Sequence, residues 1–229
     1  MSQFELTDKE FAHELKTLKE RLSGMAERAA EQIALAMEAL TTQDDELARR
    51  VIADDEALDE EESEIDKLAF EILMRRSPVA SDLRFVTMAL KFVVDVERIG
   101  DLAAGIAKRA LELNRLEDLG WRGDLTRLAM MVQKNLHLAI ESFLQGNIDE
   151  ARLVIRADQE IDRLNESLFA QLIAHVAADP ATVTRVLPLT SVSRYLERIG
   201  DHVQNLAEEV IFMVTAADVR HPQKARRSN

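Results

Sequence analysis

The 229-residue chain contains no cysteine, seven glycines and four prolines. Without cysteine it cannot form disulfides, thiolate metal sites or cysteine nucleophiles. A chain of this length has about 16 glycines and 11 prolines at average usage. Aromatic residues are also scarce, at 4%. Because β-sandwiches and barrels need turn residues and aromatic side chains, these shortages predict an all-α protein.

Long apolar runs are missing as well. The most apolar stretch, residues 85–94, covers about ten residues and contains Lys91, whereas a helix that spans a bilayer needs about 20. The first ten residues include acids and no long apolar segment, unlike a signal peptide. We therefore expect a cytoplasmic protein without membrane insertion.

The chain is strongly acidic, with a formal net charge of −13. Such a charge repels a phosphate backbone, so no nucleic-acid partner is expected. The exception is the C-terminal segment, where residues 219–229 contain four bases and no acid. We interpret this segment as a basic, disordered tail.

Two sequence blocks occur twice in the same order. The pentapeptide ERIGD stands at residues 97–101 and again at residues 197–201, a shift of 100. Residues 47–59 align with residues 150–162, a shift of 103, with six identities in thirteen positions. Repeated blocks in the same order indicate an internal tandem duplication.

Gly120 and Gly123 interrupt the helical pattern near the middle of the chain. We place a first repeat at residues 1–118 and a second at residues 119–218. Hydrophobic periodicity and turn residues predict helices at 8–40, 45–75, 79–114, 124–145, 149–178 and 181–216. Pro78 is expected in the first turn of its helix. The predicted fold is two antiparallel three-helix bundles in tandem, with six main helices.

The second helix of each repeat has an apolar seam that an aspartate interrupts. Asp55 and Asp158 occupy equivalent seam positions, and Asp59 and Asp162 follow four residues later. Residues four apart lie about 40° and 6 Å from each other on a helix. Two like charges at that spacing repel unless a cation lies between them.

The third helix of each repeat has the same carboxylate spacing. The residues are Glu97 and Asp101, then Glu197 and Asp201. If the second and third helices pair antiparallel, two carboxylate pairs meet at one groove in each repeat. Mid-helix glycines, which cost about 1 kcal/mol relative to alanine, would let a neighbouring helix or an ion approach. They are Gly100 and Gly200.

Oxygen-only clusters suit hard cations such as iron, Mn²⁺, Mg²⁺ or Ca²⁺. Zinc is less expected, because no histidine lies on the carboxylate faces. The alternative is a solvated acidic surface, in which Arg98 and Arg198 form ordinary ion pairs. Equivalent placement in both repeats favours metal binding.

No catalytic centre is visible, because the chain lacks a phosphate-binding glycine loop and a nucleophile elbow. We therefore predict that the protein is not an enzyme. Glu10 and His13 have the Glu-x-x-His spacing of di-iron bundles, but in one copy only. A ferritin-like di-iron oxidase and a structural or chaperone-like bundle stay open as alternatives.

The chain resembles the PhoU family. The two ERIGD motifs, the Asp-x-x-x-Asp pairs and the segment RSPVASDLR at residues 76–84 carry the resemblance, which extends over about residues 10–218. It implies two similar three-helix bundles. It also implies a negative regulator of phosphate uptake and of the phosphate-starvation regulon, and multinuclear iron or other metal clusters.

The resemblance further implies which residues bind metal and which proteins are partners. One cluster would use Asp55, Asp59, Glu97 and Asp101, and the other Asp158, Asp162, Glu197 and Asp201. The protein would act as an adaptor between the ATPase subunit of the phosphate ABC transporter and a sensor histidine kinase. Independently, the third helix of the first repeat is apolar on more than one face, so a homodimer is expected. That judgement rests on Val86, Met88, Leu90, Val93, Val94 and Val96.

Overall fold

The computed structural model of the chain describes residues 3–217. Over this range the chain forms α-helices and one 3₁₀ turn and no strand, which confirms the all-α prediction. The elements are α1 (Gln3–Thr42), α2 (Asp45–Asp54), α3 (Glu56–Arg76), α4 (Ala80–Leu113), α5 (Arg122–Gln145), α6 (Ile148–Ala178), η1 (Pro180–Thr182) and α7 (Val183–Thr215). Between residues 3 and 217, no helix has an apolar segment long enough to cross a membrane. The predicted basic tail lies outside the described residues.

Helices α2 and α3 form the single second helix expected from the sequence, with one irregular position. At Asp55 the backbone stays helical, with φ −62° and ψ −40°. Its carbonyl oxygen accepts from the Leu58 amide at 2.9 Å but lies 3.5 Å from the Asp59 amide, so the turn is locally tightened. The prediction of six main helices therefore holds, and the irregularity falls on a candidate ligand.

Equivalent N-cap residues begin the second helix of each repeat. Asp44 Oδ1 accepts from the amides of Glu46 and Leu47, each at 2.9 Å. Asn147, which is 103 residues later, accepts from Asp149 at 3.1 Å and Glu150 at 3.3 Å. Asp and Asn are preferred N-caps because their short side chains reach these free amides. The duplication is thus visible in the helix starts.

The expectation for Pro78 is wrong. It lies in the loop, and α4 begins at Ala80 after an extended Val79 with φ −125° and ψ 158°. Ser77 ends α3 in the left-handed region at φ 45°, and Ala80 has φ 48°. The chain therefore turns at Ser77, before Pro78 could start a helix. Pro180 does open a helical turn, the 3₁₀ segment η1.

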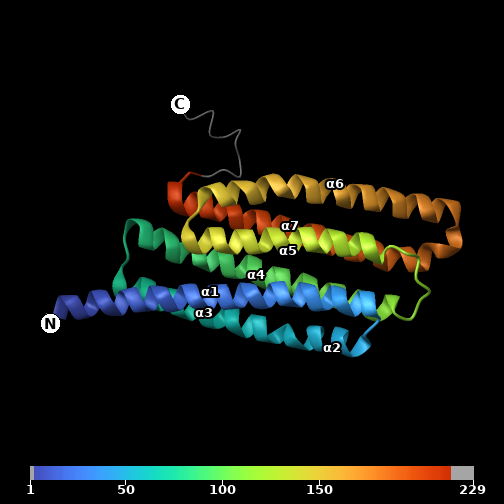
Figure 1. Cartoon of the computed structure of the whole chain (residues 1–229). Helices are drawn as coiled ribbons and strands as arrows, with labels where there is room; N and C mark the ends of the chain where they lie inside the picture. Colours follow the sequence, from blue (N-terminus) through green and yellow to red (C-terminus); the bar gives the residue numbers. More distant parts are fainter. Residues whose placement is uncertain (1–2, 218–229) are drawn as a thin grey trace.

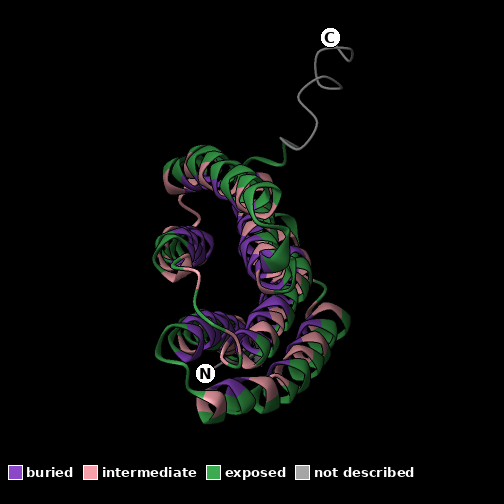
Figure 2. Cartoon of the chain, turned by 90° about the vertical axis from the view of Figure 1, so that its right-hand side faces the viewer, coloured by how far each residue is buried: buried purple, intermediate pink, exposed green. Residues whose placement is uncertain are grey.

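Helices α4 and α7 lie antiparallel in the middle of the molecule and join the two repeats (Figure 1). Helix α4 also packs against α1, α2 and α3, and α7 packs against α5 and α6. Viewed along the helices, α1 and α5 lie on one side of the central pair, and α3 and α6 lie at opposite ends (Figure 2). The two three-helix units thus meet along the contact between α4 and α7.

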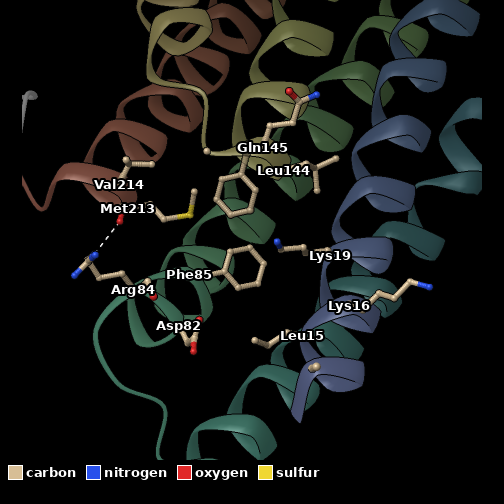
Figure 3. Close-up of a pocket in the computed structure, with 14 residues that line it drawn as sticks. Leu15, Lys16, Lys19, Asp82, Arg84, Phe85, Leu144, Gln145, Met213 and Val214 are labelled. Carbon is tan, nitrogen blue, oxygen red and sulfur yellow. Dashed lines mark hydrogen bonds between the residues drawn. The ribbon is translucent and has the colours of Figure 1, made fainter. Parts of the chain in front are cut away.

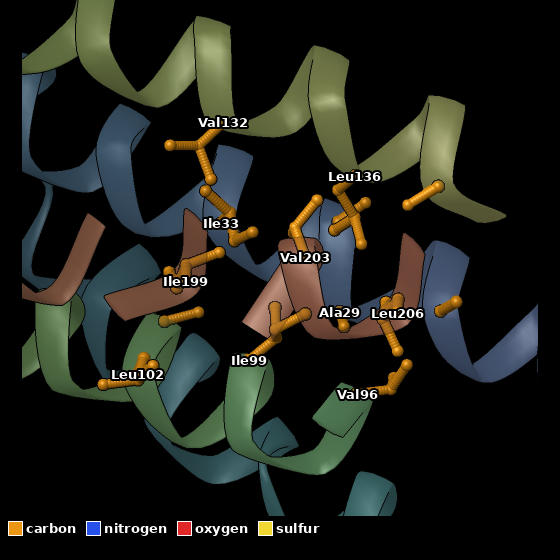
Figure 4. Close-up of a cluster of buried hydrophobic side chains, with 14 of the residues drawn as sticks. Ala29, Ile33, Val96, Ile99, Leu102, Val132, Leu136, Ile199, Val203 and Leu206 are labelled. Carbon is orange, nitrogen blue, oxygen red and sulfur yellow. The ribbon is translucent and has the colours of Figure 1, made fainter. Parts of the chain in front are cut away.

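The core is continuous across that boundary. Side chains from α1, α4, α5 and α7 meet in one buried cluster, and those labelled in Figure 4 include Ile33, Ile99, Val132 and Ile199. The extra apolar face of α4 contributes to this core: Val86, Met88, Val93 and Val96 are all buried within the chain. Most of the apolar surface that suggested a homodimer is therefore covered by the chain itself. The homodimer stays a prediction.

Contacts between α4 and α7 follow an approximate two-fold relation. A methyl group placed on Gly105 would lie 3.2 Å from the Tyr195 ring. At the position exchanged by the 100-residue shift, Asn205 Nδ2 donates to Asp95 Oδ1 at 3.3 Å. His202 Nδ1 also lies 2.6 Å from that oxygen. The central pair is thus pseudo-symmetric in position, with aromatic packing at one contact and polar bonding at the other.

Candidate functional site

The first carboxylate cluster forms where α3 meets α4. Asp55 is half-buried, and burial together with the charges of Asp101 and Asp59 raises its pKa. Burial and the same two aspartates, with Glu62, raise the pKa of Glu97 to about 7, although Arg98 opposes the shift. The structure therefore brings together the four side chains that the sequence proposed for this repeat.

The second cluster forms in the equivalent place, between α6 and α7. Asp158 is 5% exposed, and burial with the charges of Asp162, Asp201 and Glu197 raises its pKa to about 6. The pKa values of Glu197 and Asp201 are also raised, first by burial and then by neighbouring carboxylates. Asp162 and Asp201 thus destabilise the charged forms of Asp158 and Glu197, a repulsion that a bound cation would relieve.

The two mid-helix glycines allow the helices to approach at these clusters. A methyl group on Gly200 would lie 3.0 Å from Asp158 Oδ1. One on Gly100 would lie 2.4 Å from Leu58 Cδ1 and 3.5 Å from Asp55 Oδ1. The sequence-based expectation that glycine permits this close approach is confirmed.

Gly100→Ala is expected to destabilise the protein by about 1–2 kcal/mol. The gain of about 1 kcal/mol in helix propensity is outweighed by overpacking against Leu58, which is 1% exposed and would have to shift within the packed core. Gly24→Ala is the matched control, because nothing lies within 4 Å of the added methyl, and it should stabilise by up to about 1 kcal/mol. Urea unfolding of both variants measures the difference. Equal effects of the two substitutions would contradict the close approach.

In the first cluster an arginine contacts two of the carboxylates directly. Arg98 Nη1 donates to Asp101 Oδ2 at 2.9 Å, and its Nε lies 3.4 Å from Glu97 Oε2. Between residues 3 and 217, the four carboxylates of the second cluster form no ion pair and accept no side-chain hydrogen bond. Ordinary ion pairs of Arg98 and Arg198 with nearby acids were the alternative expected from the sequence. Within the described residues, the structure shows such a pair for Arg98 and none for Arg198.

Two further carboxylates belong to the clusters. Glu62 contributes to the raised pKa of Glu97, and Glu208 to that of Asp158. Each stands seven residues after a predicted ligand, Glu62 after Asp55 and Glu208 after Asp201. Seven residues is about two helical turns, so adding one three-residue step to the four-residue spacing would have found both.

A buried amide is the third feature that sequence reasoning missed. Gln32 on α1 is 6% exposed, and its Oε1 has no hydrogen-bond partner within the described part of the chain. That oxygen faces Gly100, 3.2 Å from where a methyl group would be. Its equivalent at the 103-residue shift, Asn135, instead donates to the Val154 carbonyl at 3.1 Å. The first cluster thus has an additional free oxygen nearby.

The oxygen ligands of the clusters are of the kind that a hard cation prefers, but the side chains do not converge on a single point where a cation would sit. No three His, Asp or Glu side chains in the described residues could hold a metal ion as they stand. Glu97 Oε2 is buried and accepts no hydrogen bond. Asp158 is 5% exposed and forms no ion pair within the described residues. Carboxylate oxygens left unsatisfied in this way are what Mn²⁺, Mg²⁺ or iron would bind. Binding would require rotation of these side chains.

The single Glu-x-x-His pair serves a different purpose. Arg76, at the end of α3, donates to Glu10 Oε2 at 3.2 Å and to Glu14 Oε2 at 2.8 Å. His13 is exposed. Glu10 therefore helps to fix α1 against α3, and nothing at this position supports a di-iron site.

Comparison with known proteins gives matches over nearly the whole chain. The accessory protein PhoU homolog of the phosphate-specific transport system of Pseudomonas aeruginosa is 36% identical over 214 residues, which is 93% of this chain and 88% of that protein. The Escherichia coli K12 accessory protein PhoU is 33% identical over 212 residues, with 93% and 88% covered. These names describe accessory proteins and not enzymes, as the sequence predicted.

Solved structures agree with this match. The crystal structure of PhoU from Pseudomonas aeruginosa has a TM-score of 0.87 at 35% identity and covers 90% of this chain and 100% of that one. The phosphate transport system regulatory protein PhoU from Streptococcus pneumoniae has a TM-score of 0.84 at 27% identity, with 91% and 99% covered. The PhoU domain model matches twice, at residues 22–110 and 125–210. The chain therefore belongs to the PhoU family.

Proposed function

We propose that the protein is an accessory regulator of phosphate transport that acts in the cytoplasm and represses phosphate uptake and the phosphate-starvation regulon. Support for the regulatory role comes from the names of its relatives, which cover about nine-tenths of the chain. The observation that carries the mechanism is the pair of carboxylate clusters, assembled at equivalent positions across two helices of each repeat. Each cluster joins helices that belong to one repeat only.

In this proposal the clusters bind a hard cation, iron or Mn²⁺ before Mg²⁺ or Ca²⁺. The ligands would be Asp55, Asp59, Glu97 and Asp101 in one cluster and Asp158, Asp162, Glu197 and Asp201 in the other. A bound cation supplies positive charge, which removes the repulsion among the carboxylates. The chain then holds α3 against α4 and α6 against α7 and presents a face of altered charge.

The two clusters should differ in affinity. Arg98 partly neutralises the first cluster, with contacts to Asp101 and Glu97. In the second cluster no arginine of the described residues lies within ion-pair distance, although the charges of Arg194 and Arg198 act on Glu197 from further away. Asp158 is its most buried carboxylate. A cation gains more by entering a cluster whose carboxylates have no direct ion-pair partner. We therefore assign the tighter site to the second cluster.

The adaptor would contact two partners, the ATPase subunit of the phosphate ABC transporter and the sensor histidine kinase. Co-purification at high phosphate, with tagged transporter subunit and kinase, tests this assignment. The metal-loaded wild type should retain both partners. The variant with Asp55, Asp59, Asp158 and Asp162 all changed to Ala should retain them more weakly.

A failure of the wild type to retain either partner would contradict the adaptor role. Glu31→Gln is a suitable control, because this exposed acid lies on α1 and forms no ion pair in residues 3–217. Unchanged retention by the four-aspartate variant would separate the regulatory role from metal binding. It would favour the alternative of a helical bundle whose acids are only solvated.

A further inference from the structure

A cavity of about 640 Å³ lies away from both carboxylate clusters, at the end of the molecule where α1 and α4 begin and α5 and α7 end. Figure 3 shows the side chains that line it. This volume is within the range of about 300–1,000 Å³ that small-molecule sites occupy. The function proposed above assigns no role to this cavity.

The walls of the cavity are mainly apolar. Phe85 from α4 and Phe143 from α5 have ring centroids 5.8 Å apart, and Met213 points in from α7 (Figure 3). Leu15 on α1 and Val214 on α7 complete the apolar lining. Such a surface excludes water and favours the aromatic or aliphatic part of a ligand.

The charged groups at the cavity have the sign opposite to that of the whole protein. Three bases and one acid, Asp82, line it, although the chain has 42 acids and 29 bases. Lys19 extends from α1 toward Phe85, with its ammonium 5.1 Å from the ring centroid. It has no ion-pair partner in the described chain, whereas Lys16 points away and pairs with Glu20.

The backbone at the cavity adds to this preference for an anion. Val79 caps α4 without a side-chain hydrogen bond, and the Asp82 amide donates to the Val79 carbonyl at 3.2 Å, so the helix start contributes only its positive dipole end. The carbonyl ends of α5 and α7 also reach the cavity, but two of their oxygens are satisfied. Met213 O accepts from Arg84 Nε at 2.8 Å, and Phe143 O accepts from the Gly146 amide at 3.4 Å.

We propose that this cavity binds a small amphipathic anion, with an aromatic or aliphatic body against Phe85 and Met213 and one acidic group beside Lys19. The segment of this chain that follows Val214 is a poor occupant. Residues 219–229 carry four bases and no acid. Their positive charge would be repelled by the bases that line the cavity.

Binding of 8-anilinonaphthalene-1-sulfonate to protein labelled with ¹³C at the methionine methyl groups tests the proposal. The Met213 methyl signal, assigned with Met213→Leu, should shift and saturate. Met74 and Met130, which are 74% and 64% exposed on other surfaces, report non-specific adsorption and should not saturate with it. Octanoate should displace the probe, and octylammonium should not.

Two variants locate the site. Lys19→Met should weaken the affinity roughly tenfold by removing the charged contact, and Ala12→Trp, at an exposed lining position on α1, should abolish binding by filling the cavity. Lys134→Met, at an exposed lysine on α5 that does not line the cavity, should leave it unchanged. Thermal unfolding verifies that each variant is folded. Parallel shifts at all three methionines, equal competition by octylammonium, or unaltered binding in both cavity variants would overturn the proposal.

Discussion

Asp158→Asn is expected to stabilise the metal-free protein at pH 8 by about 2 kcal/mol. Asp158 is 5% exposed and its charge is opposed by burial and by Asp162, Asp201 and Glu197. Asparagine has nearly the same shape without the charge, and its amide can donate to these carboxylates. A shift of one pKa unit corresponds to about 1.4 kcal/mol, and solvent screening reduces the total.

With cation present, the same substitution should have the opposite consequence. Saturating Mn²⁺ stabilises a protein that binds it by about 4 kcal/mol at a thousandfold excess over Kd, and loss of one ligand from the second cluster should remove much of that gain. Urea unfolding with chelator and with Mn²⁺ gives both values. Glu160→Gln is the control, because this exposed acid lies on the same helix two residues away. A destabilised metal-free Asp158→Asn protein, or equal stabilisation by Mn²⁺, would contradict the cation site.

The stability of the metal-free wild type should fall as the pH rises from about 4 to about 7. Burial and like charges raise the pKa of Asp158 from 3.8 to about 6 and that of Glu97 from 4.5 to about 7. Between these values the native state holds protons that the unfolded chain has released. The stabilisation is therefore complete below the unfolded pKa and is lost as the pH passes the folded pKa.

Other groups do not cancel this trend. The pKa values of Asp55, Glu197 and Asp201 are raised as well. Arg76 lowers the pKa of Glu14, but that stabilisation is lost only as the pH falls below the ordinary carboxylate range. Thermal unfolding in chelator from pH 4.5 to 8 measures the slope, which Asp158→Asn should reduce. A midpoint that rises over this interval would be incompatible with the clusters as described.

Helix positions could be predicted from the sequence because local signals determine them. Apolar periodicity and the turns near Asp44 and Gly146 placed α2 and α6 within a few residues of their observed starts. Pro78 was misplaced because the left-handed Ser77 ends α3 first, a backbone choice that no residue pattern specifies. The irregular turn at Asp55 likewise depends on its packing against α4.

The composition of the clusters was predictable, but their charge balance was not. Spacing along each helix identified all eight carboxylates, and the duplication placed them equivalently. Spacing does not determine that Arg98 bonds to Asp101 while Arg198 bonds to no carboxylate of the second cluster. Nor does it predict that α7 covers the second apolar face of α4, because this contact joins residues about 100 positions apart.

Metal content of the purified protein tests the assignment of the carboxylate clusters most directly. The protein is prepared without chelator or affinity-tag metal, incubated with Mn²⁺ or iron, desalted and measured by elemental analysis beside the variant with Asp55, Asp59, Asp158 and Asp162 changed to Ala. We predict more than one equivalent of metal per wild-type chain and almost none in the variant. Wild-type protein without bound metal after incubation, or a variant that retains as much metal as the wild type, would contradict the clusters as cation sites.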